Sequence, residues 1–307
     1  MGQVMRTFLK ILGGVIGAVV ILGAVAVAWA YFGSERKLHR TVDVTVAPIA
    51  IPTDGAAIER GGYLYASRGC KECHGSDGAG KIVFNEGGFY AKAAHISAGE
   101  SSITAAYKPE DWVRTIRHGV KPSRQPLFVM PSEDYARLTD ADVGAVVAFI
   151  KSLPPVEGTP TEFRVPLIVR LLYTAGVIED AAEKINHKLP PAQPIAAGDI
   201  VGQGRYVAAA CQGCHNPSFS GGLIPGAPPS WPAAANLTPG EGTVIGRYPD
   251  AKVLAAMFRS GRRPDGTDVN PAMPFETLSS LSDDDVNAVY AYLKTLPPKK
   301  RGDAPPA

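Results

Sequence analysis

The 307-residue sequence has almost no excess of charge of either sign. It carries 31 lysines and arginines against 29 aspartates and glutamates, a formal net charge of +2. Two of the basic residues, Arg6 and Lys10, precede a long apolar run, so that the rest of the chain is balanced in charge. A nucleic-acid-binding protein would show a basic face. The composition indicates none, and we expect no nucleic-acid partner.

Cysteine is also scarce, and all four cysteines lie in two copies of one motif. Cys70-Lys71-Glu72-Cys73-His74 and Cys211-Gln212-Gly213-Cys214-His215 both read Cys-x-x-Cys-His. This is the attachment pattern of c-type haem: each cysteine forms a thioether with a haem vinyl group, and the histidine binds the iron as its proximal ligand. No cysteine remains for another role. The sequence therefore predicts two covalently bound haem c groups at these residues.

Two other roles for paired cysteines explain the motif less well. A disulfide within each motif would close a very short loop, which gives little entropic stabilisation and does not explain the histidine. A zinc site built from both pairs would join cysteines as distant in the sequence as Cys73 and Cys211. It would also leave the histidine beside each pair unexplained.

The N-terminus contains one long apolar run. Residues 11–33 carry no charge, and as an α-helix they would extend about 34 Å, enough to cross a bilayer. Because Arg6 and Lys10 precede the run, the positive-inside rule places the N-terminus in the cytoplasm. A signal peptide cleaved after Ala28 or Ala30 is the alternative, but the run exceeds the usual apolar region of such peptides. We expect a single-pass inner-membrane protein whose haem domains lie on the periplasmic side.

The rest of the chain contains the same ordered set of signals twice. His74 corresponds to His215, and Met130-Pro131 corresponds to Met273-Pro274 at nearly the same offset along the sequence. An offset that changes so little indicates a duplicated domain with small loop changes. We predict an anchor at 1–34, a tether at 35–56, a first haem domain at 57–155, an interdomain linker at 156–197, a second haem domain at 198–298 and a tail at 299–307.

Two of the five methionines occupy matched positions in this repeat. Met130 follows His74 at almost the same sequence distance as Met273 follows His215. A haem that only carries electrons has both axial positions filled by protein, and a thioether ligand favours ferrous iron. We expect His74 and Met130 to bind one iron, and His215 and Met273 the other. A methionine that fills a gap in the core is the alternative at each position, and we expect that role for Met257.

Other polar residues are weaker candidates for the haem sites. His95 stands where the second repeat has Asn236, and it is the alternative distal ligand for the first haem. Arg117 and Arg259 occupy matched positions and could pair with haem propionates, or form exposed or interdomain salt bridges. His187, in the predicted linker, is expected to be solvated.

With these residues identified, the chain resembles the membrane-bound multihaem cytochrome c subunits of bacterial periplasmic dehydrogenases, those of alcohol and gluconate dehydrogenases. Three stretches carry the resemblance: residues 111–120, 235–239 and 271–275. It implies an all-α fold, with two tandem class I cytochrome c domains behind the N-terminal transmembrane helix. The best-known members of that family carry three haems, whereas two motifs stand here.

The resemblance and the ligand pattern together predict an electron carrier. We expect a diheme cytochrome that relays single electrons between a periplasmic or membrane dehydrogenase and the respiratory chain. The quinone pool, a cytochrome or a terminal oxidase would be the other exchange partner, and the chain would not be an enzyme on its own. The alternative is a diheme enzyme, a peroxidase or thiol-oxidising cytochrome, which needs one iron with an open position. A methionine in both domains speaks against it.

Overall fold

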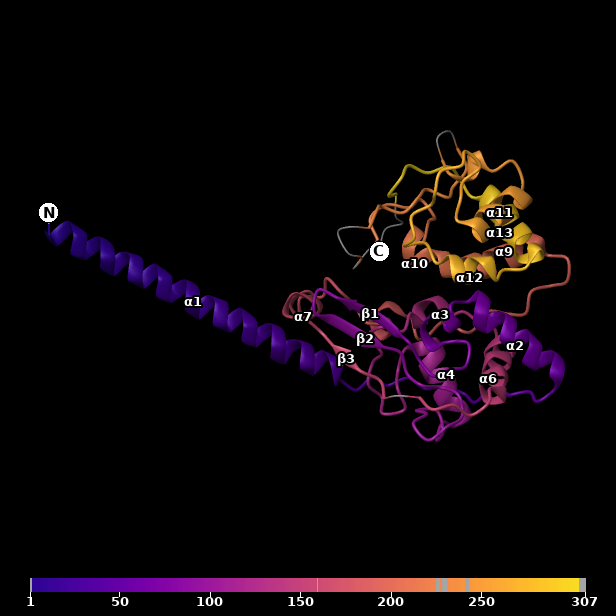
Figure 1. The fold of residues 1–307 in the computed structure, drawn as a ribbon, viewed down its shortest axis with the longest axis horizontal. Coiled ribbons are helices and arrows are strands. Elements are labelled where there is room, and N and C mark those ends of the chain that lie inside the picture. The colour runs from indigo at the N-terminus through magenta and orange to yellow at the C-terminus, as the bar shows by residue number, and fades with distance from the viewer. Residues whose placement is uncertain (1, 159, 225–226, 228–230, 241–242, 304–307) are drawn as a thin grey trace.

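A long helix, α1 (Gly2–Leu38), projects from a body of two stacked units (Figure 1). The structure, a computed structural model, describes residues 2–158, 160–224, 227, 231–240 and 243–303. Within these ranges α1 is the one helix long and apolar enough to cross a membrane, and its most apolar stretch is not buried against the rest of the protein. The helix continues to Leu38, past the anchor boundary predicted at residue 34. The start of the predicted tether, 35–38, is therefore helical.

The first haem unit is built on two helices that pack closely. Its helices are α2 (Gly55–Ser67), α3 (Cys70–His74), α4 (Pro109–His118), α5 (Ser132–Tyr135) and α6 (Asp140–Ser152). Asp54 caps α2 and Thr139 caps α6, each by accepting a hydrogen bond from the backbone of the first turn. Gly61 of α2 lies against the carbonyl of Ala145 on α6, where a Cβ would overlap it. The two helices can approach this closely only because residue 61 is glycine.

The second unit repeats this packing. Its elements are α9 (Ile200–Ala208), the 3₁₀ turn η1 (Ala209–Cys211), α10 (Gln212–His215), η2 (Ile245–Arg247), α11 (Ala251–Ser260), α12 (Phe275–Ser279) and α13 (Asp283–Thr295). Gly204 of α9 lies against the carbonyl of Ala288 on α13, just as Gly61 lies against Ala145. Of the tail predicted at 299–307, residues 304–307 lie outside the described residues, and the Lys299 carbonyl accepts a hydrogen bond from Asn236 at 2.7 Å.

A small antiparallel sheet adds strands to this mostly helical fold. Strand β1 (Ile82–Glu86) pairs with β2 (Phe89–Lys92), and β2 pairs with β3 (Phe163–Arg164). Neither the sheet nor its third strand was expected from the sequence. Because β3 lies within 156–197, part of the predicted interdomain linker belongs spatially to the first unit.

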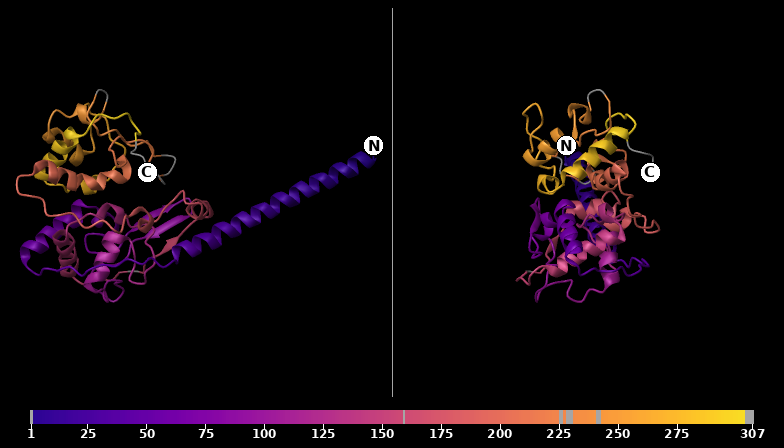
Figure 2. Two further views of the ribbon diagram at one scale, coloured as in Figure 1. Left: turned by 180° about the vertical axis from the view of Figure 1, so that it is seen from behind. Right: turned by 90° about the vertical axis from the view of Figure 1, so that its right-hand side faces the viewer.

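The same segment forms two more helices against the first unit and α1. They are α7 (Leu167–Thr174) and α8 (Ala181–Lys184). Figure 1 shows α7 beside the point where α1 joins the body, and Figure 2 shows the second unit stacked on the first from two further directions. Segment 156–197 therefore connects the haem units and also joins the first unit to the long helix.

Candidate haem-binding sites

Both motif histidines are held in one orientation by the backbone. His74 Nδ1 lies 2.9 Å from the Ala94 carbonyl, and His215 Nδ1 lies 2.8 Å from the Ala235 carbonyl. In each case Nδ1–H donates, so that Nε2 keeps its lone pair for a metal. Burial lowers the pKa of both rings, although the backbone hydrogen bond opposes it. Each imidazole is therefore neutral near pH 7, which is the form that binds iron.

The four motif cysteines lie in apolar surroundings. They form neither of the local disulfides considered above. Burial, then the neighbouring Cys73, raises the pKa of Cys70 to about 12; burial, then Asp134, raises the pKa of Cys211 to about 12. In the described part of the chain no cluster of three or more His, Cys, Asp or Glu side chains could hold a metal ion, which disfavours the zinc alternative. Neutral thiols in an apolar wall suit neutral thioethers to haem.

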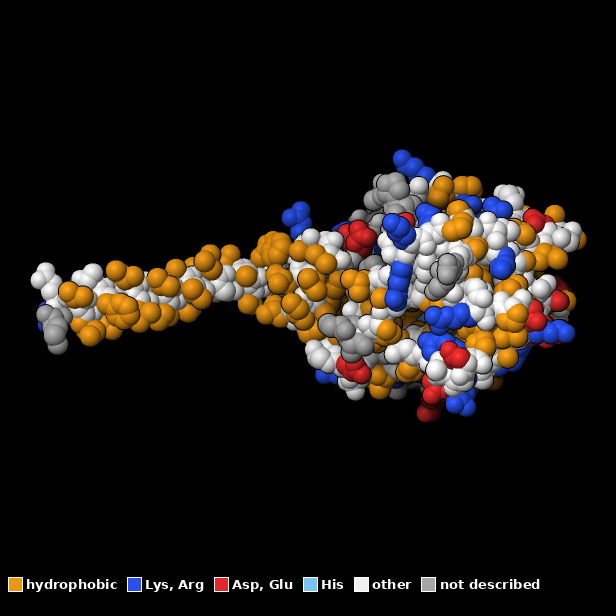
Figure 3. Space-filling model, turned by 90° about the horizontal axis from the view of Figure 1, so that it is seen from above, with side chains coloured by type: hydrophobic (Ala, Val, Ile, Leu, Met, Phe, Trp, Pro, Cys, Tyr) orange, Lys and Arg blue, Asp and Glu red, His pale blue; other side chains and the backbone are white. Residues whose placement is uncertain are grey.

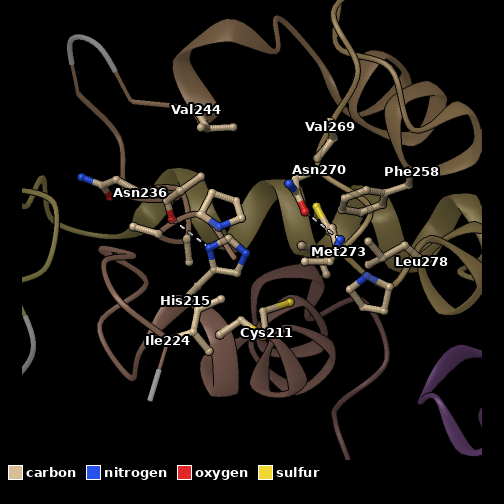
Figure 4. A pocket seen from close by; sticks show the side chains of 18 of the residues that line it. Cys211, His215, Ile224, Asn236, Val244, Phe258, Val269, Asn270, Met273 and Leu278 are labelled. Carbon is tan, nitrogen blue, oxygen red and sulfur yellow. Dashed lines mark hydrogen bonds between the residues drawn. The ribbon is translucent and has the colours of Figure 1, made fainter. Parts of the chain in front are cut away.

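The second motif opens onto a cavity of about 860 Å³. Cys211, Cys214, His215 and Met273 all line it, and Figure 4 shows the labelled members of this set at the wall of one cavity. The volume is within the range that holds cofactors in proteins. Apolar side chains make up much of the wall, among them Val207, Ile224, Val244, Phe258, Val269, Leu278, Leu281 and Val289. The residues present therefore fit a haem group.

Basic residues at the same cavity fit the two carboxylates of a haem. They are Arg247, Arg263, Lys299, Lys300 and Arg301. Guanidinium groups bind carboxylates through paired hydrogen bonds. The sequence interpretation singled out Arg259 instead, whose guanidinium pairs with Asp283 at 2.5 Å. Its counterpart Arg117 pairs with Asp140 at 2.6 Å. Each ion pair joins two residues of the same unit, so the alternative of an interdomain salt bridge at these arginines is wrong.

The two candidate methionines occupy equivalent places. Met130 and Cys70 both pack against the core of the first unit, and Met273 and Cys211 both pack against the core of the second. Each methionine directly precedes the proline at the N-cap of a short helix, α5 or α12. Met257 is 4% exposed and lies within the core of the second unit, as predicted.

Two histidines outside the motifs have structural partners. His95 is 1% exposed, and its ring nitrogens lie 2.9 Å from Ser101 Oγ and 3.1 Å from Ser97 Oγ. Both nitrogens are thus engaged by a polar loop. His187, expected to be solvated, is instead half-buried: its Nδ1 lies 3.0 Å from Nδ1 of His118. That expectation is wrong because segment 156–197 packs onto the first unit.

The two units meet through a pair of contacts that repeat each other. Tyr63 of α2 donates from its hydroxyl to Asp285 of α13 at 2.5 Å. Tyr206 of α9 donates in the same way to Asp142 of α6 at 2.6 Å. Each tyrosine therefore reaches the carboxylate of the other unit. Because the two tyrosines occupy equivalent positions of the repeat, as do the two aspartates, the interface has approximate two-fold symmetry.

The haem-attachment helices take part in the same symmetric interface. Glu72 of α3 accepts two hydrogen bonds from Thr277 of α12, from the backbone N–H at 2.9 Å and from the hydroxyl at 2.5 Å. In the equivalent place, Asp134 of α5 faces Gly213 of α10. Burial, then the charge of Glu133, raises the pKa of Asp134 to about 7. Each attachment helix thus contacts the helix that follows the methionine of the other unit.

A buried arginine lies at the interface between the two units. The Arg68 side chain is 4% exposed, and its Nη2 lies 3.6 Å from the Asp285 carboxylate. Among the described residues that nitrogen has no hydrogen-bond partner. Its neighbour Ser67 lines the cavity of the second unit, although it belongs to the first. The cavity therefore reaches the domain interface.

Sequence reasoning missed these interface residues. Tyr63, Asp142, Tyr206 and Asp285 belong to no motif, but the offset that relates Met130 to Met273 also relates these tyrosines and these aspartates. This shared offset is the signal in the sequence that could have indicated these four residues as equivalent positions of the repeat.

Comparison with known proteins agrees with this geometry. Residues 56–150 match the family model of cytochrome c oxidase, cbb3-type, subunit III, and residues 201–297 match that of cytochrome c. The fold and the two sites thus define a c-type cytochrome with two tandem cytochrome c domains. These domains imply two covalently bound haem c groups, as predicted.

Individual relatives narrow this class. The fructose dehydrogenase cytochrome subunit of Gluconobacter japonicus is 28% identical over 278 residues, 81% of this chain and 55% of the relative. The gluconate 2-dehydrogenase cytochrome c subunit of Pantoea cypripedii is 26% identical over 271 residues, 78% of this chain and 60% of the relative. A diheme c-type cytochrome of Cereibacter sphaeroides is 26% identical over 266 residues, which are 78% of this chain and 85% of the relative. The chain is a diheme relative of dehydrogenase cytochrome subunits, and it spans little more than half the length of the first of them.

Proposed function

We propose that this protein is a membrane-anchored electron carrier that relays single electrons between a dehydrogenase and the respiratory chain. Haem iron, when bound, supplies the one-electron ferric–ferrous couple, and the chain supplies attachment, burial and axial ligands. His74 and Met130 would hold one iron, and His215 and Met273 the other. The matched positions of these residues against the two cores support this assignment.

The symmetric interface is the observation that carries the proposal. Helix α3 contacts α12 through Glu72 and Thr277, and α10 lies against α5 at Gly213 and Asp134. Because each attachment helix touches the other unit, haem groups attached to α3 and α10 would both be held near the domain interface, which would favour electron exchange between them. Two domains that functioned independently on a common linker would not need contacts between their haem-attachment helices and the other unit.

The partners and the location belong to the proposal as well. The printed names of the fructose and gluconate dehydrogenase relatives support a dehydrogenase as electron donor. The quinone pool, another cytochrome or a terminal oxidase would accept the electron. Helix α1 would be retained as a single-pass anchor in the inner membrane, with the haem domains in the periplasm. Its retention is supported by the contacts of Ala30 and Ser34, which are both 0% exposed, with α7.

The test is made on the purified full chain. It should hold two haems that survive acid-acetone extraction, and both should be low-spin in both oxidation states because methionine fills each sixth position. The reduced protein should therefore bind carbon monoxide poorly at both irons. Fast, stoichiometric binding at one haem, together with peroxide turnover, would refute the carrier and favour a diheme peroxidase.

A further inference from the structure

Helix α7 and its flanks expose large apolar side chains to the outside of the molecule. Leu167 and Ile168 are 47% and 59% exposed, and Phe163 and Val177 are 36% and 66% exposed. We call these four residues the α7 patch. Figure 3 shows hydrophobic side chains gathered where the long helix meets the body. Groups of large exposed apolar residues commonly mark contact with a partner or a membrane.

The α7 patch lies at a definite level along α1. Thr174 Oγ1 donates to the Ala30 carbonyl at 3.2 Å, and a Cβ at Gly33 would overlap the Thr174 methyl. Arg170 donates to Ser34 Oγ at 2.8 Å. These contacts fall at the end of the uncharged run 11–33, where the spanning helix would leave the hydrocarbon. Helix α7 would therefore lie at the height of the membrane surface.

Polar contacts just beyond this level make the joint stiff. Arg40 holds Asp180 with two hydrogen bonds, at 2.6 and 2.9 Å, and Tyr173 donates to the same carboxylate at 2.6 Å. Both Tyr173 and Asp180 are 0% exposed. Lys37 donates to the Tyr173 carbonyl at 2.9 Å. Because these buried groups tie α1 to α7 and α8, the patch cannot swing away from the helix that would anchor it.

We propose that the α7 patch lies in the interfacial layer of the bilayer that α1 spans. Amphipathic helices bury their apolar face about 5–10 Å into the boundary between headgroups and acyl chains. Helix α7 is too short to bind alone, but α1 fixes it at that depth. The occupant is lipid because the patch continues the lipid-facing surface of α1, where Tyr31 and Phe32 are 51% and 71% exposed. This inference rests on the retained anchor proposed above.

The consequence for the protein is a fixed orientation. A chain held only by one spanning helix and a flexible tether could tilt freely, so that its haem edges would vary in height. Two attachments to the same membrane surface, α1 and the patch, define one orientation of the first unit. The symmetric interface then defines the height of the second unit.

The test measures water access to the patch in a lipid bilayer. Since haem attachment consumes all four natural cysteines, Ile168→Cys would carry the one free thiol of the chain. The full chain is placed in nanodiscs of phosphatidylcholine with some phosphatidylglycerol, which leave both membrane faces open to solution. The rate of reaction with a charged maleimide, divided by the rate with an uncharged one, is measured by intact mass. Val177→Cys is a second patch variant, and Ala56→Cys, at the exposed start of α2, is the control.

We expect this ratio to be roughly tenfold lower for Ile168→Cys and Val177→Cys than for Ala56→Cys, because the interface excludes charged reagents. Equal ratios in a chain that remains in the disc would overturn the inference and leave the anchor intact. Protection in native membranes but not in lipid nanodiscs would also overturn it, in favour of a protein partner. A chain that fails to enter the disc would instead refute the anchor itself.

Discussion

Replacing Tyr63 and Tyr206 by phenylalanine tests the symmetric interface directly. Each substitution removes one hydroxyl, which donates to a carboxylate of the other unit at 2.5 or 2.6 Å. A hydrogen bond to a charged group contributes about 1.5–3 kcal/mol. The carboxylates keep a second donor each, Arg60 for Asp142 and Gln203 for Asp285. We therefore expect the lower end of that range.

Each single variant should lower the free energy of unfolding by about 1.5 kcal/mol. The double variant should lose about 3 kcal/mol if the two contacts are independent, and a different sum would measure their coupling. With a urea dependence of about 1–3 kcal/mol per molar, the double variant's midpoint should fall by roughly 1–3 M. The assay is urea unfolding of the full chain in detergent, followed by haem absorbance and far-ultraviolet circular dichroism.

The control is Tyr290→Phe, which removes a hydroxyl that donates to the Tyr248 carbonyl at 2.9 Å within the second unit. It should lower the stability of that unit without uncoupling the two. The Tyr63→Phe and Tyr206→Phe variants should separate the unfolding of the units, because each loses a contact between them. A neutral surface substitution usually changes the free energy of unfolding by no more than about 0.5 kcal/mol. A change that small in the double variant would refute a stabilising role of the two tyrosine contacts.

Three further outcomes are expected. Met273→Ala should remove about half of the far-red sulfur-to-iron absorption band and open one iron to carbon monoxide. The control Met257→Ala should leave the band unchanged and lower the free energy of unfolding by about 2–5 kcal/mol through lost packing. Absorption spectra and urea unfolding measure these effects, and an unchanged band in Met273→Ala would contradict the ligand assignment. Replacing Cys70 and Cys73 together should leave one covalent haem, so that haem staining on a denaturing gel falls to about half. Undiminished staining would exclude the first motif as a haem-attachment site. Because the pKa of Asp134 is raised to about 7, the stability it gives is full below its ordinary pKa of 3.8 and is lost as the pH rises through about 7. Asp134→Asn should flatten that fall in a pH series of unfolding curves, and an unaltered slope would contradict the shift.

The parts of the fold that local chemistry specifies were predictable from the sequence. The Cys-x-x-Cys-His motifs, the long apolar helix at the N-terminus and the core position of Met257 follow from local spacing and apolar composition. The prediction of two cytochrome c domains is confirmed. The axial ligation by Met130 and Met273 stays a prediction.

Contacts between distant segments were not predictable in this way. Strand β3 consists of Phe163 and Arg164, which pair with β2 from a much earlier part of the chain. So short a strand has no periodicity of its own, and its partner depends on how segment 156–197 folds back. The ion pair between Arg40 and the buried Asp180 has the same origin, since both residues look like ordinary surface charges in the sequence. The joint between α1 and the first unit was therefore missed.

The repeated tyrosine–aspartate contact also has a bearing on how a two-domain chain can arise. A contact in which the same pair of positions is used in both directions has the form of an isologous homodimer interface. One ancestral domain with Tyr and Asp at these positions could pair with its own copy. Joining two copies in one gene, through the segment 156–197, would make that pairing intramolecular, with an effective concentration set by the connection rather than by expression level. Each copy could then diverge, as Arg60 and Gln203 have, while the shared face keeps the two haem domains together.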